Sequence, residues 1–369
     1  MENKQFEINF INFLKKIKNN RIFILTGKQS YSKSGARYYV NKYLLNKDLN
    51  IFFKKEKYPK ISELKKIILK IKKIKPQYIL AIGGGSVMDY AKIANCLDNK
   101  KINLNIRKAN IKLKKKSIVV AIPTTAGSGS EVTSGAVIYI NKIKYSVEGK
   151  EIVPDNYFLV PKLIMKNSKN LKASSGFDAI SQGVESLISR KSSNKSVNYA
   201  KKSLEILFKS YPLYLKEATL DRSRKMLIGS NFSGKAISIS KTTAPHAVSY
   251  PLTSHYNIPH GNAVSLTINE FLDYNFNNIN KADVNFNLNK RFKLLFKISG
   301  TRSITEFLKF LDKLKKKAKL ENQFRKIKVP RKKIISKVMS GINIRRLSNN
   351  PIQLTKDEVK MIISKNLLK

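Results

Sequence analysis

The sequence has few cysteines, few histidines and few acidic residues. It contains one cysteine, Cys96, three histidines, and 24 acidic residues against 73 basic ones. A single cysteine cannot form an internal disulfide, and the apolar helical pattern around Cys96 favours a small core residue over a reactive thiol. No apolar run reaches the ~18 residues that a membrane span needs. The first 20 residues lack the apolar core and cleavage site of a secretory signal, so we expect a cytoplasmic protein that does not bind a membrane.

The shortage of acidic residues gives a formal net charge of +49. Such a charge can indicate binding to nucleic acid or to an anionic membrane. Here the lysines are spread along the whole chain, no nucleic-acid module signature accompanies them, and asparagine, isoleucine, tyrosine and phenylalanine are abundant too. This pattern favours compositional drift in an AT-rich genome, and we predict no nucleic-acid partner. A positive field of any origin still favours an anionic substrate and cofactor.

The chain is long enough for two domains, and its patterning changes near residue 165. Before that point, short β-rich runs alternate with helical patterns, which is typical of βαβ units around a Rossmann-like parallel sheet. The predicted strands are 21–27, 51–55, 77–85 and 117–125, and the predicted helices between them are 30–45, 62–74 and 86–97. Later helices are predicted at 178–189, 198–215, 226–239 and 261–274. We therefore predict an α/β nucleotide-binding domain over 1–165 and an all-α metal-binding domain over 166–369.

Two loops rich in glycine and hydroxyl side chains follow predicted strands. Gly83, Gly84, Gly85 and Ser86 lie between an apolar strand and an amphipathic helix, where free N–H groups can bind a pyrophosphate. The spacing is not GxGxxG, so a tight turn is an alternative explanation. The second loop, PTTAGSGSEVT at 123–133, follows the next strand, at the edge where open α/β sheets bind ligands. Two such loops together favour a nucleotide site.

The three histidines all lie between residues 246 and 260. On one unbroken helix, His246 and His260 would be about 21 Å apart, too far to share one ion. Pro251 and Pro259 argue against such a helix, and a bent connection could bring both imidazoles together.

The third predicted ligand is Asp178, with Gln182 four residues later on the same helix face. Two imidazoles and a carboxylate suit Fe²⁺ or Zn²⁺ with an open position for a substrate oxygen. A lone histidine is more often an ordinary hydrogen-bonded side chain, but clustering in a histidine-poor chain favours a metal site.

Four segments together resemble the iron-containing (group III) alcohol dehydrogenases, which are related in fold to dehydroquinate synthase. They are AIGGGSVMDYAK, IPTTAGSGSEVT, SSGFDAISQGVES and TAPHAVSYPLTSHYNIPHG, and the resemblance extends over residues 20–360. It implies a dehydroquinate synthase-like fold and a metal-dependent, nicotinamide-dependent alcohol dehydrogenase that acts as an aldehyde reductase.

The same resemblance implies a set of cofactor residues. It places the pyrophosphate on Gly83 to Ser86 with Asp89 and Lys92 beside it, and Lys144 near the nicotinamide ribose. It assigns to the cofactor cleft Thr124, Thr125, Ser128 and Thr133. Many NAD-using relatives carry an aspartate after the first strand, where this chain has Gly27, followed by Lys28 and Ser30. Because no carboxylate excludes a 2′-phosphate there, we predict NADPH, with NADH as the alternative.

The family's metal ligands are an aspartate and three histidines, which correspond here to Asp178, His246, His260 and, at the remaining histidine position, Gln182. A glutamine carbonyl can coordinate, but it is usually a weaker ligand than imidazole. Either Gln182 binds the metal, or the site is weakened, or the protein is inactive. The segments ISISKTTAPHAVSYPLT and RRLSNNP resemble a narrower branch, the phosphonoacetaldehyde reductases (hydroxyethylphosphonate dehydrogenases), in which the glutamine would be a branch feature.

The resemblance implies hydride transfer from the nicotinamide to a carbonyl that the metal polarises as a Lewis acid. Three groups could supply the proton: Tyr250, His255 or a water molecule. At the position of Tyr250 many relatives carry a histidine. A phosphonate substrate needs cationic partners, and the candidates are Lys241 and His255, with Arg190 less favoured, although solvated surface charges explain these residues equally well. The alternatives are a general short-chain alcohol or aldehyde dehydrogenase and a metal-free degenerate relative. The oligomeric state stays open, with a homodimer as one option.

Overall fold

The computed structural model describes residues 2–17, 21–45, 47–109, 111–320 and 330–368, which form two compact units. One unit comprises Met1–Ser168 and Ala218–Ile228, and the other comprises Lys169–Glu217 and Gly229–Lys369. None of the described helices is long and apolar enough to cross a membrane.

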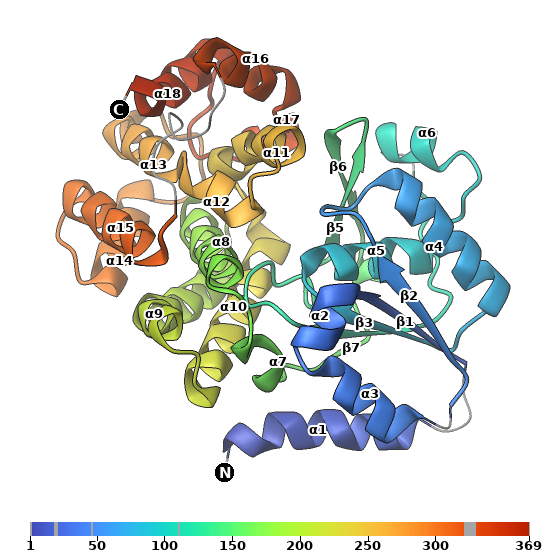
Figure 1. The fold of residues 1–369 in the computed structure, drawn as a ribbon. Helices are drawn as coiled ribbons and strands as arrows, with labels where there is room; N and C mark the ends of the chain where they lie inside the picture. Colours follow the sequence, from blue (N-terminus) through green and yellow to red (C-terminus); the bar gives the residue numbers. More distant parts are fainter. Residues whose placement is uncertain (1, 18–20, 46, 110, 321–329, 369) are drawn as a thin grey trace. The chain divides into compact units, whose positions relative to one another are not determined.

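The first unit is built on a five-stranded parallel sheet with the strand order β2-β1-β3-β4-β7 (Figure 1). In chain order its strands are β1 (Ile22–Gly27), β2 (Leu49–Lys54), β3 (Tyr78–Gly83), β4 (Ile118–Pro123) and β7 (Asn156–Tyr157). Because β1 lies between β2 and β3, the strand order reverses at β1 and β3. In open α/β sheets this switch point is where ligands bind, beyond the carboxyl ends of the strands.

Alternate side chains of the central strands enter two separate cores. Phe23, Leu25 and Ala81 pack with α4 (Ile61–Ile74) and α5 (Gly85–Cys96). The side chains on the other face of the same strands pack with α1 (Glu2–Lys16) and α3 (Ala36–Leu44). These side chains belong to Ile22, Ile24, Leu80 and Ile82. A parallel sheet that is covered on both faces reads as a continuous apolar run, which is how these strands appear in the sequence. The predicted α/β class of this part is confirmed.

Two details of the first unit differ from the prediction. The single helix predicted over 30–45 is wrong: α2 (Lys28–Lys33) and α3 are separated at Gly35, whose φ of 91° no helix accommodates. The antiparallel hairpin of β5 (Gly135–Ile140) and β6 (Ile143–Glu148) was not predicted. Its two-residue turn, Asn141 and Lys142, has positive φ at both positions, as a type I′ turn requires. The remaining short elements are α6 (Ile102–Arg107), η1 (Lys150–Ile152) and α7 (Lys162–Met165).

The second unit is helical, and its described residues contain no strand beyond a single β-bridge between Ala282 and Ile352. Its elements are α8 (Lys169–Ile188), α9 (Asn194–Lys216), most of α10 (Leu220–Ser240), α11 (Ala244–Tyr256), α12 (His260–Ser265), α13 (Ile268–Asn277), η2 (Ile279–Lys281), α14 (Leu288–Ser299), α15 (Ile304–Ala318), α16 (Arg331–Gly341), α17 (Ile344–Leu347) and α18 (Lys356–Leu368). The all-α prediction is confirmed. The single helix predicted over 261–274 is wrong, because α12 and α13 are separate there.

We expect Cys96 to resist alkylation in the native protein. The side chain is 3% exposed, its Sγ lies 3.4 Å from the carbonyl oxygen of Glu151, and burial raises the pKa of the thiol to about 11. At pH 8 little thiolate is therefore present, and iodoacetamide cannot reach it. Mass spectrometry should show labelling in urea and almost none without it; rapid labelling of the native protein would contradict the assignment as a core residue.

Candidate metal centre and cofactor loops

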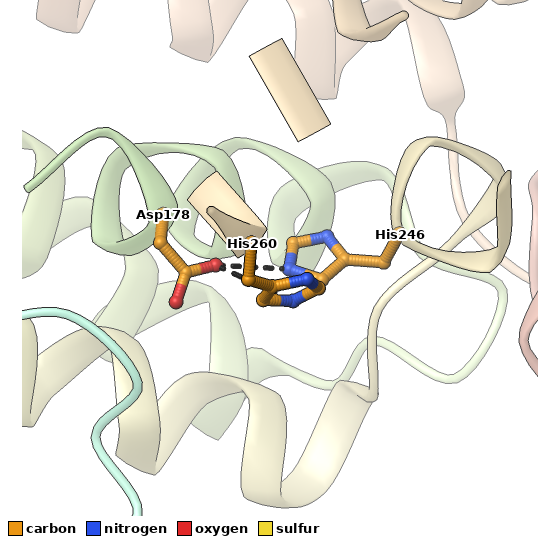
Figure 2. A group of neighbouring side chains, drawn as sticks. All are labelled: Asp178, His246 and His260. Carbon is orange, nitrogen blue, oxygen red and sulfur yellow. Dashed lines mark hydrogen bonds and ion pairs between the residues drawn. The ribbon is translucent and has the colours of Figure 1, made fainter. Parts of the chain in front are cut away.

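Asp178, His246 and His260 converge in the second unit and are called the metal triad below (Figure 2). Asp178 Oδ1 lies 3.3 Å from His246 Nε2 and 3.9 Å from His260 Nε2, and one ligand atom from each residue lies within 4.8 Å of the others. Asp178 and His246 are buried, whereas the His260 side chain is 35% exposed. One oxygen and two imidazole nitrogens are a donor set for Zn²⁺ or Fe²⁺, and the exposure of His260 leaves one side accessible.

A break between two helices brings the two histidines together. α11 continues through Pro251, and the carbonyl of Ala247, which proline leaves without its helical donor, accepts a hydrogen bond from the Asn343 N–H at 3.5 Å. α11 ends where Asn257 adopts a left-handed φ of 55°, and α12 begins at His260 directly after Pro259. The predicted bent connection therefore lies at residues 257–259, and Pro251 does not interrupt the helix.

A glycine next to His260 allows α12 to lie against α8. A Cβ added at Gly261 would be 1.9 Å from the carbonyl oxygen of Ser174 and 3.0 Å from Asp178 Cβ. Only a residue without a side chain permits this approach. Gly261 thus sets the distance between the two helices that carry His260 and Asp178.

Glu185 contacts the triad although the sequence analysis did not identify it. It is fully buried on α8, and its Oε2 hydrogen-bonds His246 Nδ1 while its Oε1 accepts from the Thr243 N–H and hydroxyl, both at 2.9 Å. A carboxylate on Nδ1 fixes the tautomer that presents Nε2 to a metal. The signal available in the sequence was its position seven residues after Asp178, on the same helix face.

The electrostatics of the triad suit a cation. Burial by itself lowers the pKa of His246, but the carboxylates of Glu185 and Asp178 outweigh it and raise that pKa to about 9. Burial by itself raises the pKa of Asp178, but hydrogen bonds from His246 and Gln182 and the charge of the histidines hold it below its usual range. Two buried carboxylates thus face two imidazoles, an arrangement that positive charge stabilises. The residues fit a divalent metal.

Gln182, predicted as a fourth ligand, lies beside the triad. Its Nε2 donates to Asp178 Oδ2 at 3.2 Å, and its Oε1 accepts from the Ser233 hydroxyl at 3.1 Å. The structure therefore brings Gln182 to the predicted place, with its amide hydrogen-bonded to two neighbours.

Tyr250 also belongs to this site, whereas His255 lies outside the metal triad. The Tyr250 ring stacks on His260 with centroids 5.5 Å apart and an interplanar angle of 11°. Burial raises the pKa of Tyr250 to about 12, although Arg346 acts in the opposite direction. His255 lies nine residues after His246, half a turn away around α11, and its ring packs against Tyr256.

The predicted anion-binding residues have different surroundings. Lys241 follows α10 with a left-handed φ of 61°, immediately before Thr242 and Thr243, which contact the site. Arg190 forms an ion pair with Asp283 at 2.7 Å, so its charge is already matched.

In the first unit, the two predicted cofactor loops lie against each other. Gly83 ends β3, Gly84 is the N-cap of α5, and Gly85 and Ser86 open that helix. A Cβ at Gly85 would lie 2.6 Å from Ser128 Oγ, and one at Gly84 would lie 3.3 Å from Thr125 Oγ1.

The backbone joins the same two loops, since the Thr124 N–H donates to the Gly83 carbonyl at 2.9 Å. A helix N-terminus beside hydroxyl side chains at the carboxyl ends of β3 and β4 is chemically suited to a pyrophosphate.

Lys92 holds the second loop on α5. It is 1% exposed, and its Nζ donates to the carbonyl oxygens of Ser130 at 3.0 Å, Thr133 at 2.7 Å and Gly135 at 2.7 Å. The predicted cofactor residue Thr133 also places its hydroxyl 2.9 Å from this ammonium group. The loop geometry therefore depends on one buried charge.

The other predicted cofactor residues surround these loops. Burial raises the pKa of Asp89, which accepts from the Ser130 hydroxyl at 2.8 Å, while Lys92 and Lys144 partly offset this effect. Lys144 is buried on β6. Gly27 ends β1, and Lys28 and Ser30 lie in the first turn of the helix that follows, α2. The Gly27 carbonyl accepts a hydrogen bond from the Ser30 hydroxyl at 3.1 Å.

Comparison with known proteins agrees with this architecture over both units. Residues 7–161 match the family model for iron-containing alcohol dehydrogenase, and residues 172–367 match the model for the C-terminal region of the Fe-containing alcohol dehydrogenase family. The solved iron-containing alcohol dehydrogenase from Thermotoga maritima superposes with a TM-score of 0.80 at 26% identity, covering 99% of this chain and 95% of that one.

Two curated relatives illustrate the range of substrates. The aldehyde-alcohol dehydrogenase of Clostridium acetobutylicum is 31% identical over 283 residues, which are 71% of this chain and 32% of that protein. The phosphonoacetaldehyde reductase of Streptomyces viridochromogenes is 30% identical over 216 residues, which are 56% of this chain and 55% of that protein. The matches thus span less than two thirds of the length of either relative.

Proposed function

Because the chain belongs to the iron-containing alcohol dehydrogenase family, we propose that it is a metal-dependent, nicotinamide-dependent oxidoreductase that reduces a small aldehyde. The observation that supports this most is the convergence of Asp178, His246 and His260. A bound divalent metal supplies Lewis-acid polarisation of a carbonyl oxygen, and a bound nicotinamide supplies the hydride.

The protein's own residues hold and orient these groups. Asp178, His246 and His260 hold the metal, and Glu185 keeps His246 with its Nε2 available. The glycine-rich start of α5 binds the pyrophosphate. Tyr250 is protonated at neutral pH, and because its ring stacks on His260 we favour it over His255 as the proton donor to the product alkoxide.

The test is metal analysis of anaerobically purified protein, combined with an NAD(P)H oxidation assay. We expect about one equivalent of Fe²⁺ or Zn²⁺ per chain and aldehyde-dependent oxidation of the cofactor, and both should be lost in Asp178→Ala. A protein that binds neither metal and turns over no aldehyde would favour the degenerate, metal-free relative instead.

For the substrate, we propose phosphonoacetaldehyde, reduced to 2-hydroxyethylphosphonate. The similarity to the Streptomyces reductase, the net charge of +49 and the position of Lys241 next to Thr242 support an anionic aldehyde. The rival is an unsubstituted short-chain aldehyde, favoured by the similarity to the Clostridium enzyme. The ratio of kcat/KM for phosphonoacetaldehyde to that for propanal decides between them, and a ratio below one would overturn the phosphonate proposal.

We propose NADPH as the cofactor and expect Gly27→Asp to shift the preference towards NADH. A carboxylate at the end of β1 can bind the ribose 2′-OH and repels a 2′-phosphate. A Cβ at this position would lie 2.8 Å from Ser30 Oγ, so Gly27→Ala serves as the control for the steric effect alone. The measurement is kcat/KM for NADPH and for NADH. If the ratio of these two values is unchanged in Gly27→Asp, the residue at position 27 does not discriminate between a 2′-phosphate and a 2′-hydroxyl.

A further inference from the structure

Gln182 lies at the position of a predicted metal ligand, but its side-chain amide forms hydrogen bonds with two other side chains. The side chain is buried on α8, one turn after Asp178. Its Nε2 donates to Asp178 Oδ2 at 3.2 Å, and its Oε1 accepts from Ser233 Oγ at 3.1 Å. Both ends of the amide are therefore in use.

The two oxygens of Asp178 have different neighbours. Oδ1 faces His246 Nε2 at 3.3 Å and His260 Nε2 at 3.9 Å, whereas Oδ2 receives the amide of Gln182. A metal shared with the two histidines would thus bind Oδ1, the oxygen that Gln182 does not contact.

The chemistry of the partners determines which way the amide points. An ionised carboxylate only accepts hydrogen bonds, so Asp178 requires the NH₂ group of Gln182. The opposite orientation would place the amide oxygen against a carboxylate oxygen. The Ser233 hydroxyl then faces Oε1, and its single proton lies between two acceptors, Gln182 Oε1 at 3.1 Å and the Ser230 carbonyl oxygen at 2.8 Å.

We propose that Gln182 is a positioning residue that holds Asp178 by Oδ2 and so presents Oδ1 to the metal. The protein then supplies three ligands, and the remaining coordination positions are open to a substrate oxygen and water. α8 carries one ligand and two orienting residues on one face, because Glu185 acts on His246 as Gln182 acts on Asp178. This inference rests on one part of the proposed function, namely that the metal triad binds a metal.

The test is the metal affinity and the Co²⁺ absorption spectrum of Gln182→Leu, measured on the full chain after metal removal. We expect Zn²⁺, measured in competition with a chromophoric chelator, to bind about 10- to 100-fold more weakly, since loss of a hydrogen bond to a ligand has effects of this size. At saturating Co²⁺ the visible spectrum should match that of the wild type, because the three protein ligands are unchanged.

The chain offers a matched control in Gln353→Leu. Gln353 Nε2 also donates to an aspartate, Asp283 Oδ2, at 2.9 Å, but at an exposed site away from the triad. The chemical change is the same, and the Zn²⁺ affinity of this variant should equal that of the wild type.

Three results would overturn the inference. A Co²⁺ spectrum altered in Gln182→Leu means that Gln182 is a ligand, and a wild-type Zn²⁺ affinity in that variant means that it does not position Asp178. If Gln182→Leu does not fold, Ser233→Ala removes the side-chain partner of Oε1 together with a hydrogen bond to the Ser230 carbonyl within α10. A several-fold loss of Zn²⁺ affinity in this variant supports the proposal, and no loss contradicts it. If the wild type itself binds neither Zn²⁺ nor Co²⁺, the proposed function fails as well, so the two failures are distinguishable.

Discussion

Gly261→Ala is expected to weaken Zn²⁺ binding by about 100-fold, the upper end of the range for changes that disturb the orientation of a ligand. The new Cβ would lie 1.9 Å from the backbone oxygen of Ser174, and no change of rotamer can relieve a clash between a Cβ and a backbone atom. α12 must therefore move away from α8, and His260, the preceding residue, moves with it. Competition with a chelator measures the affinity, and thermal denaturation of the metal-free protein measures the accompanying loss of stability.

Gly135→Ala is the control for this experiment. A Cβ there has Glu148 Cγ at 3.8 Å as its nearest neighbour, an ordinary contact, and the residue lies in the other unit. Its Zn²⁺ affinity should be that of the wild type. If Gly261→Ala also binds Zn²⁺ normally, the close approach of α12 to α8 does not determine the position of His260.

Lys92→Met is expected to lower the free energy of unfolding by about 3–5 kcal/mol, because it leaves three carbonyls without this buried donor, at about 1–3 kcal/mol for each unsatisfied group. The carbonyls of Ser130, Thr133 and Gly135 would lose the ammonium group, and Asp89 would lose its nearby positive charge. The loop that faces Gly85 would also lose its attachment, so NADPH should bind more weakly. Urea denaturation and titration of NADPH fluorescence measure the two effects.

Lys116→Met separates the effect of burial from the loss of a lysine. Lys116 Nζ also contacts a carbonyl, that of Leu97 at 2.7 Å, and an aspartate, Asp98 at 2.8 Å, but its side chain is 32% exposed. The expected loss of stability is below about 1 kcal/mol, because water screens and replaces these interactions. If both variants lose the same free energy of unfolding, the burial of Lys92 does not increase its contribution to stability.

The parallel sheet and the chemistry of the metal site could be predicted from local sequence features. Strands such as Ile22–Gly27 and Tyr78–Gly83 are largely apolar on both faces because both faces are covered, and this pattern is visible without any tertiary information. His246 and His260 stand out because the chain has only three histidines, whereas Asp178 was proposed from the resemblance of its segment to the family. The hairpin at residues 135–148 was missed because its two-residue turn, Asn141 and Lys142, lacks the glycine that usually marks a type I′ turn.

Side-chain partners far apart in the sequence were beyond such reasoning. Glu185 and Gln182 have helical spacing from Asp178, but only the packing of α8 against α10 and α11 shows that one contacts His246 and the other connects Asp178 to Ser233. The buried position of Lys92, and its three carbonyl partners some 40 residues later, contradict the expectation that lysine is exposed.

The sequence by itself thus determined the fold class, because hydrophobic periodicity is a local property, and it proposed Asp178, His246 and His260 as metal ligands, which the structure brings together. The tertiary structure alone decided that the helix break at Asn257 and the absence of a side chain at Gly261 bring His260 close to Asp178. It also decided which oxygen of the Asp178 carboxylate faces the histidines. The physical reason is that a metal site is set by distances of a few ångströms between separate helices, and those distances depend on packing that no single segment specifies.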